Sequence, residues 1–453
     1  MQRLKETKMT TSNKLSITHF IPLVGPFVMG ADQLQGEFKI DEKYIFSFEP
    51  FTNNQQHITA NFPSKTITYL PEDILPDYAY PGWEDNSSYV NYIKDNSIEK
   101  TDLMLAVPPC AGLSMLNTGN RGAGCAANRW MYETVKWNVA QGNKCLLLEN
   151  APGLVGAEGV KVLREIERIL THLGVRDEYK LHCTKTNTMQ HGLPQNRQRT
   201  FLFVYKAEEF KIFKNITNDL PTLEEFFDKN ARPEEVEPGT NHDVLTPGHA
   251  SEPLQYLNKF ELWDEARSQV DTFGTKTVSK MLLRHYEEFP ERFTEFPKLT
   301  RVLEHFNEKL SRDLGYWDSN PMVAKGKVNA VIAKNAFNII HPKYNRVLTV
   351  RELMDLMGLP NDFVLQGDIK KNFNHICQSL PVNTGKDHIR WAHGIINNDS
   401  KYVSSGSSIS SDIFLQNNTK GDLENDLLEV KGSSVEFKKI SRNKKTILKS
   451  FLN

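Results

Sequence analysis

Short runs of hydrophobic residues recur through residues 15–205, and each run ends at a proline, a glycine or a polar residue. Residues 103–107 form such a run and stop at two prolines, which is typical of a buried parallel strand. Residues 144–148 predict a second buried strand. Residues 158–173 carry apolar side chains at helical spacing and stop at Gly174, as an amphipathic helix does. This alternation of strands and helices predicts an α/β lobe.

The pattern changes after residue 205. The following segment has helix-like charged stretches and scattered prolines without strand–helix alternation, which predicts a separate, smaller lobe. Near the end, the chain is rich in Ser, Asn, Asp and Lys, which predicts disorder. We therefore divide the chain into a flexible arm at 1–14, a large lobe at 15–205, a smaller lobe at 206–330, a return to the large lobe at 331–396 and a disordered tail at 397–453.

Composition narrows the class of protein. The 453 residues are 39% hydrophobic and 25% charged, which is ordinary for a globular protein of more than one domain. A stretch of roughly 18 apolar residues that could span a membrane is absent, and we expect no secretory signal. The five cysteines form no CxxC pair, so we expect neither disulfides nor a zinc site, and a reducing interior. The net charge of −1 says nothing about nucleic acid, because a DNA enzyme needs only a local basic cleft.

The first candidate for chemistry is Cys110, which follows the predicted strand at 103–107 by way of two prolines. Ligands of open α/β sheets bind beyond the carboxyl ends of the strands, so a cysteine held there is a candidate nucleophile. Glu149 ends the neighbouring predicted strand and would reach the same edge. The alternative for Cys110 is a buried cysteine that acts only as a small hydrophobic residue.

Four motifs occur in order along the chain: VPPCAGLS at 107–114, LLLENAPGL at 146–154, QHGLPQNRQRTFLFV at 190–204 and RVLTVRELMDLMGLPNDF at 346–363. This series resembles that of the DNA (cytosine-5) methyltransferases, over roughly residues 14–395. The resemblance implies a Rossmann-like, S-adenosylmethionine-dependent methyltransferase sheet with a target-recognition lobe at 206–330.

The resemblance also implies a catalytic mechanism on a cytosine flipped out of double-stranded DNA. The Cys110 thiolate would add to C6, and Glu149, with a pKa raised by burial, would protonate N3. Arg199, and Arg197 through its surrounding network, would stabilise charge at O2, while Asn150 would hold the exocyclic amine.

The cofactor side departs from the family's pattern. The residues that the resemblance places near S-adenosylmethionine are Phe20, Gly25, Glu49, Asp73, Pro108 and Ser379. Pro22 and Val24 stand where two glycines are usual, and Cys377 and Gln378 replace a glycine and an asparagine. We therefore expect S-adenosylmethionine to bind more weakly than is usual, or a different transferable group to fit better.

A capping box is predicted in the last motif, where Thr349 is followed three positions later by Glu352. The family's equivalent element buttresses the two lobes. We therefore interpret Arg346, Arg351 and Glu352 as structural residues.

Three functions remain open at this point. The first is an active DNA (cytosine-5) methyltransferase of a restriction–modification system. The second is an enzyme on the same scaffold that transfers another group to C5, and the third is a catalytically silent DNA-binding protein. Retention of Cys110, Glu149 and Arg199 together argues against the third. We expect a monomer that binds double-stranded DNA but no metal or membrane, in the cytoplasm of a prokaryotic or phage-infected cell, with the tail either flexible or a DNA tether.

Overall fold

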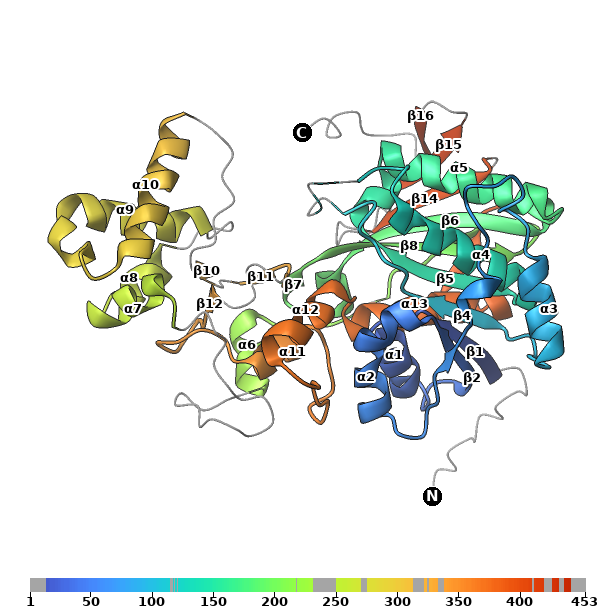
Figure 1. Cartoon of the computed structure of the whole chain (residues 1–453), viewed down its shortest axis with the longest axis horizontal. Coiled ribbons are helices and arrows are strands. Elements are labelled where there is room, and N and C mark those ends of the chain that lie inside the picture. The colour runs from blue at the N-terminus through green and yellow to red at the C-terminus, as the bar shows by residue number, and fades with distance from the viewer. Residues whose placement is uncertain are drawn as a thin grey trace, which may run out of the picture.

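The computed structural model describes residues 14–114, 117, 119, 121–216, 218–230, 250–269, 275–312, 322–323, 326–332, 338–409, 411–418, 426–431 and 436–440. The expected flexible arm therefore lies outside the described residues, apart from residue 14, which begins the first strand. Figure 1 shows a large α/β lobe and a smaller lobe of helices beside it.

A ten-stranded mixed sheet runs through the described part of the large lobe. Its strands, in spatial order, are β16 (Glu436–Ile440), β15 (Asp426–Lys431), β14 (Ile413–Asn418), β6 (Tyr179–Asn187), β8 (Gln198–Lys206), β5 (Cys145–Asn150), β4 (Leu103–Ala106), β1 (Lys14–Phe20), β2 (Lys39–Ser47) and β3 (Thr68–Tyr69). Strands β1 to β5 are parallel to one another, whereas β8 is antiparallel to both of its neighbours.

Helices cover both faces of this sheet. On one face lie α4 (Arg129–Gln141) and α5 (Ala157–His172), and on the other lie α1 (Pro26–Gln33) and α13 (Val382–Asn397) (Figure 1). Every residue of β4 and β5 is buried, which explains why both strands read as continuous apolar runs rather than as alternating patterns. The predicted strands at 103–107 and 144–148 and the predicted helix at 158–173 are confirmed to within two residues.

Shorter helices complete the large lobe. They are α2 (Thr52–Asn61), α3 (Ser87–Asp95), α6 (Leu223–Lys229), α11 (Val350–Leu356) and α12 (Ile369–Gln378). Helix α11 begins with the predicted capping box: Glu352 N donates to Thr349 Oγ1 at 3.1 Å and Thr349 N donates to Glu352 Oε2 at 2.8 Å. Glu352 also receives two hydrogen bonds of 2.9 Å from Arg346, so the structural role expected for this pair is confirmed.

The smaller lobe consists of α7 (Glu252–Lys259), α8 (Trp263–Ser268), α9 (Thr275–Glu288) and α10 (Pro297–Ser311) around an apolar cluster of its own. The start of the expected lobe at 206–330 belongs to the large lobe instead. Strand β9 (Lys211–Phe213) pairs with β13 (Val403–Ser405). Helix α6 shares one apolar cluster with α11. No helix in the described ranges is long and apolar enough to cross a membrane.

The expectation of a disordered tail at 397–453 does not hold for the residues that the structure describes. Strand β14 lies beside β6 in the main sheet, and β15 and β16 continue the sheet outward. Ile413, Phe414 and Leu415 are all buried. The prediction of disorder rested on the polar composition of the whole tail, in which three apolar residues carry little weight. The edge of β6 supplies the backbone hydrogen-bond partners that a lone strand needs.

Candidate active site

Two neighbouring parallel strands bring the candidate nucleophile and acid to one edge of the sheet. In the β4–β5 ladder Ala106 lies opposite Leu148, so the loop after β4 and the end of β5 leave the sheet side by side. The loop passes through the buried Pro108 and reaches Cys110, a free cysteine of intermediate exposure. Glu149 is the penultimate residue of β5 and is 2% exposed. The structure thus confirms that the two side chains share an edge.

Arg199 completes this group from the antiparallel strand β8. Its Nε lies 2.9 Å from Glu149 Oε1, an ion pair that leaves this buried oxygen without an aligned hydrogen bond among the described residues. Burial raises the pKa of Glu149, and the charges of Arg199 and Arg197 oppose this rise without cancelling it. The carboxyl group is therefore set up to hold a proton more readily than an exposed glutamate.

The same charges act on the thiol. Burial raises the pKa of Cys110, the Glu149 carboxylate raises it further, and the Arg199 and Arg197 guanidinium groups lower it. Cys110, Glu149 and Arg199 are therefore electrostatically coupled.

Arg197 holds the surrounding backbone, and its charge also acts on Cys110 and Glu149. It is fully buried and donates to Val331 O at 2.8 Å, Cys377 O at 2.5 Å and Ser379 O at 2.6 Å. One side chain thereby joins the turn before β8 to two segments that lie more than a hundred residues later. The network around Arg197 therefore consists of backbone carbonyl groups from these two segments.

The structure does not bring Asn150 to the site. Successive residues of a strand face opposite sides of a sheet, so Asn150 points away from Glu149 and toward α4. Its Nδ2 lies 3.3 Å from Met131 Sδ, and its Oδ1 accepts from Ala151 N at 2.8 Å. Asn150 is fully buried in this position, which corrects the expectation that it holds the exocyclic amine.

Gln195 links distant segments by hydrogen bonds, a role that the sequence did not predict. Its Nε2 donates to Leu356 O at 2.7 Å and its Oε1 accepts from Val331 N at 3.0 Å. It therefore fastens the turn before β8 to α11. Its place in the PQNRQR motif was the available signal, but the partners are distant in sequence.

The turn after β1 has positive φ angles, which favour glycine, at one glycine and at two other residues. Gly25 has φ +87°, and a Cβ there would lie 2.8 Å from the Ile58 side chain, so glycine is required. Ile21 and Leu23 adopt φ values of 49° and 50°, which strains non-glycine residues. Val24 packs into the apolar cluster around α11.

The residues expected to contact the cofactor have unused polar groups. Glu49, in the turn after β2, and Asp73 are exposed, and neither carboxylate makes a hydrogen bond or ion pair with another described residue. Ser379 is 1% exposed, and its hydroxyl group has no hydrogen-bond partner in the described part of the chain. Phe20 is fully buried and stacks on Trp137, with ring centroids 5.4 Å apart. Free carboxylates and an unpaired buried hydroxyl fit a ligand with ribose and amino-acid groups.

The structure shows no cluster of three or more His, Cys, Asp or Glu side chains that could hold a metal ion within the residues it describes.

Comparison with known proteins agrees with this geometry. The family model described as C-5 cytosine-specific DNA methylase matches residues 83–390. The Type II methyltransferase M.Bpa9945I of Bacillus paralicheniformis is 22% identical over 323 residues, which cover 64% of this chain and 70% of the relative. The Type II methyltransferase M.DdeI of Desulfomicrobium norvegicum is 25% identical over 293 residues, covering 60% and 65%.

Two solved structures share the fold. A DNA modification methyltransferase encoded within an E. coli prophage superposes with a TM-score of 0.52 at 15% identity, covering 85% of this chain and 100% of the other. A methyltransferase of Entamoeba histolytica gives a TM-score of 0.50 at 10% identity, covering 84% and 98%. The expected methyltransferase sheet is thereby confirmed. With the family model spanning most of the large lobe and the Cys110–Glu149–Arg199 group, the chain belongs to the C-5 cytosine-specific DNA methylases and is a DNA cytosine-5 methyltransferase.

Proposed function

We propose that Cys110, Glu149 and Arg199 carry out the transfer of a methyl group from S-adenosylmethionine to C5 of a cytosine flipped out of double-stranded DNA. One observation carries the assignment of these residues: the buried Glu149 carboxyl group lies 2.9 Å from Arg199, and both groups act electrostatically on the Cys110 thiol. A binding protein without activity would gain nothing from keeping such a buried carboxyl–guanidinium pair beside a cysteine.

Cys110 has the role of nucleophile. Its sulfur adds to C6 of cytosine, and the electron pair of the C5–C6 double bond moves so that C5 becomes nucleophilic. Because burial raises the Cys110 pKa, the thiol gives its proton to solvent water before the thiolate adds to C6. After C5 has gained the methyl group, loss of the C5 proton to solvent water, return of the N3 proton to Glu149 and expulsion of the Cys110 thiolate restore the double bond.

Glu149 has the role of general acid at N3. Addition of sulfur to C6 increases electron density at N3 and O2, and a proton delivered to N3 stabilises the adduct. The raised Glu149 pKa favours the protonated form that this step requires. Arg199 balances the charge of Glu149 and supplies guanidinium donors toward O2, which is consistent with its partly exposed side chain.

S-adenosylmethionine, when bound, supplies an electrophilic methyl group. We assign its ribose hydroxyl groups to Glu49, its adenine amino group to Asp73 and its amino-acid end to Ser379, because these three residues have unused polar groups. Phe20, Gly25 and Pro108 shape the same edge.

The helices α7 to α10 form the lobe to which we assign reading of the DNA sequence. We propose that the protein acts as a monomer. The Type II methyltransferases among the relatives support a role on DNA inside a prokaryotic or phage-infected cell.

Nucleoside mass spectrometry tests the proposed function. DNA incubated with the protein and S-adenosylmethionine should contain 5-methylcytosine, whereas Cys110→Ser should form none. Glu149→Gln should be slower by about 10² to 10⁴-fold, since an amide cannot supply the proton. An active Cys110→Ser protein, or a modified cytosine other than 5-methylcytosine, would contradict the proposal.

A further inference from the structure

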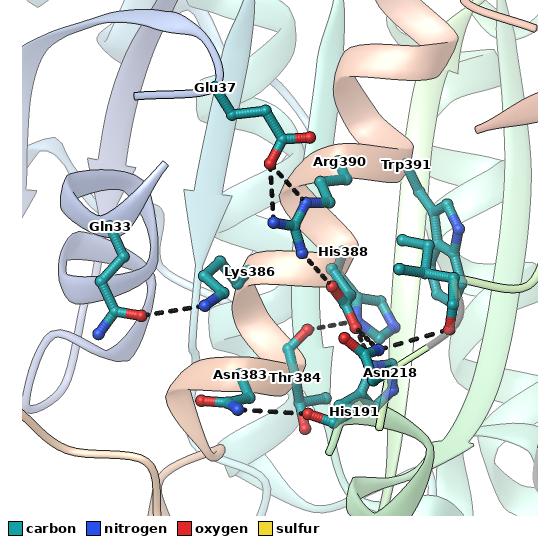
Figure 2. Close-up of polar contacts among 12 residues, drawn as sticks. Gln33, Glu37, His191, Asn218, Asn383, Thr384, Lys386, His388, Arg390 and Trp391 are labelled. Carbon is teal, nitrogen blue, oxygen red and sulfur yellow. Dashed lines mark hydrogen bonds and ion pairs between the residues drawn. The ribbon is translucent and has the colours of Figure 1, made fainter. Parts of the chain in front are cut away.

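We propose that Asp387 and His191 are positioning residues for methyl transfer, because they fix the turn that carries Arg197 and Arg199. This inference rests on the proposed function and adds to it a buried polar network behind the catalytic edge (Figure 2). The network lies between α13 and the segments packed on it, and neither residue touches the reacting atoms.

Asp387 is the centre of the network and is 1% exposed. Its Oδ2 accepts from His191 Nδ1 at 2.7 Å and from Asn218 Nδ2 at 2.8 Å, and its Oδ1 accepts from Arg390 Nη1 at 2.6 Å. Burial alone would raise the Asp387 pKa, but the hydrogen bond and charge of His191, with Arg390 and Asn218, hold it below its usual value. The carboxylate therefore stays ionised and keeps all three donors in place.

His191 links Asp387 to β6, the strand that pairs with the Arg199 strand β8. Its Nε2 lies 2.7 Å from Thr186 Oγ1, and Thr186 is the register partner of Arg199 in the β6–β8 ladder. The imidazole thus bridges α13 and the residue opposite Arg199 with one hydrogen bond on each ring nitrogen.

The 3₁₀ helix η6 (Thr188–His191) passes the same restraint to Arg197. Thr188 at its start donates to Arg197 O twice, from its backbone N at 2.9 Å and from its Oγ1 at 3.1 Å. At its end, His191 O accepts from Asn383 Nδ2 at 3.3 Å. The short helix is therefore held by α13 at one end and holds the turn before β8 at the other.

A second contact from α13 is made with the strand residue that lies opposite Glu149. His388 stacks on Phe201 with ring centroids 3.5 Å apart, and Phe201 is the cross-strand partner of Glu149. Register partners in an antiparallel ladder share a face, so α13 packs behind both members of the Glu149–Arg199 pair. Loss of Asp387 should loosen this pair, and a misplacement of about 1 Å can cost on the order of 100-fold in rate.

The far end of the network supplies a matched control. Arg390 also donates to Glu37 Oε2, from Nε at 2.9 Å and from Nη2 at 2.7 Å, and Glu37 lies in the turn before β2. Glu37→Gln weakens the same network through Arg390 but leaves the Asp387–His191 contact intact.

The test compares the steady-state kinetics of DNA methylation by wild-type protein, Asp387→Asn and Glu37→Gln, with urea unfolding of each. We expect Asp387→Asn to lose about 10- to 100-fold in kcat with KM for DNA within about twofold of wild type. Glu37→Gln should keep the wild-type kcat even where its unfolding midpoint falls. If Asp387→Asn does not fold, His191→Asn, which can still donate to Asp387 but cannot reach Thr186, should show the same loss of kcat.

A folded Asp387→Asn protein with kcat within about twofold of wild type would overturn the inference. So would equal losses of kcat in Asp387→Asn and Glu37→Gln, because the network would then act only through stability. Failure of the proposed function is distinguishable, since in that case the wild-type protein itself would form no 5-methylcytosine.

Discussion

At the scale of single residues, the ends of two neighbouring strands determine where the candidate nucleophile and acid lie. Cys110 and Glu149 follow two apolar runs that could only be neighbouring strands, so their meeting at one edge follows from the fold class. Asn150 shows where this reasoning was incomplete. The alternation of side chains along a strand already implies that Glu149 and Asn150 face opposite sides of the sheet, and the structure places them so.

The coupling of the thiol to its neighbours predicts its reactivity. Glu149→Gln removes a negative charge that raises the Cys110 pKa, so the pKa should fall and the thiolate fraction at a given pH should rise. Arg199→Gln removes a positive charge that lowers the pKa, so the thiolate fraction should fall. We expect iodoacetamide to alkylate Cys110 about three- to tenfold faster in the first variant and more slowly in the second.

Peptide mass spectrometry measures these alkylation rates across a pH series, with the Cys125 peptide of the same protein as internal reference. Equal Cys110 rates in wild type and both variants would show that these charges do not reach the thiol.

At the scale of elements, short local motifs predicted helix α11 correctly, whereas the polar composition of the tail wrongly predicted disorder where β14 forms. The capping box of α11 was readable because it lies within four consecutive residues, Thr349 to Glu352. Strand β14 was not, because only three consecutive apolar residues stand in a polar stretch. Its stability comes from β6, whose Leu181 lies opposite Ile413 in the ladder.

We expect a substitution in β14 to destabilise the large lobe. Phe414 is fully buried and packs on His182 and Phe210, with ring centroids 4.6 and 5.6 Å away. Phe414→Ala should lower the free energy of unfolding by about 3 to 5 kcal/mol. Urea unfolding measures the change, and Ser408→Ala, at an exposed position of the same segment, should leave stability unaltered. If both variants unfold like wild type, this strand does not belong to the folded core.

At the scale of the whole molecule, the division into two lobes could be predicted but the contacts between distant segments could not. Arg197 binds the carbonyl groups of Cys377 and Ser379, and His191 binds Asp387. Nothing local to either segment indicates its partner, because such pairs arise only when α12, the turn after it and α13 pack beside the sheet (Figure 1). Neighbouring strands therefore position the catalytic residues, and segments near the end of the chain support them.

The central claim is that Cys110 forms a covalent bond to cytosine, and trapping on modified DNA tests it most directly. In 5-fluorocytosine the fluorine replaces the proton that must leave C5, so the thiolate cannot be expelled after methyl transfer. With S-adenosylmethionine and DNA that contains this base at the target position, the wild-type protein should migrate on a denaturing gel as a protein–DNA adduct attached through Cys110. Cys110→Ser should bind the same DNA without forming the adduct. A wild-type protein that methylates ordinary DNA but forms no adduct, or an adduct that persists in Cys110→Ser, would contradict the account.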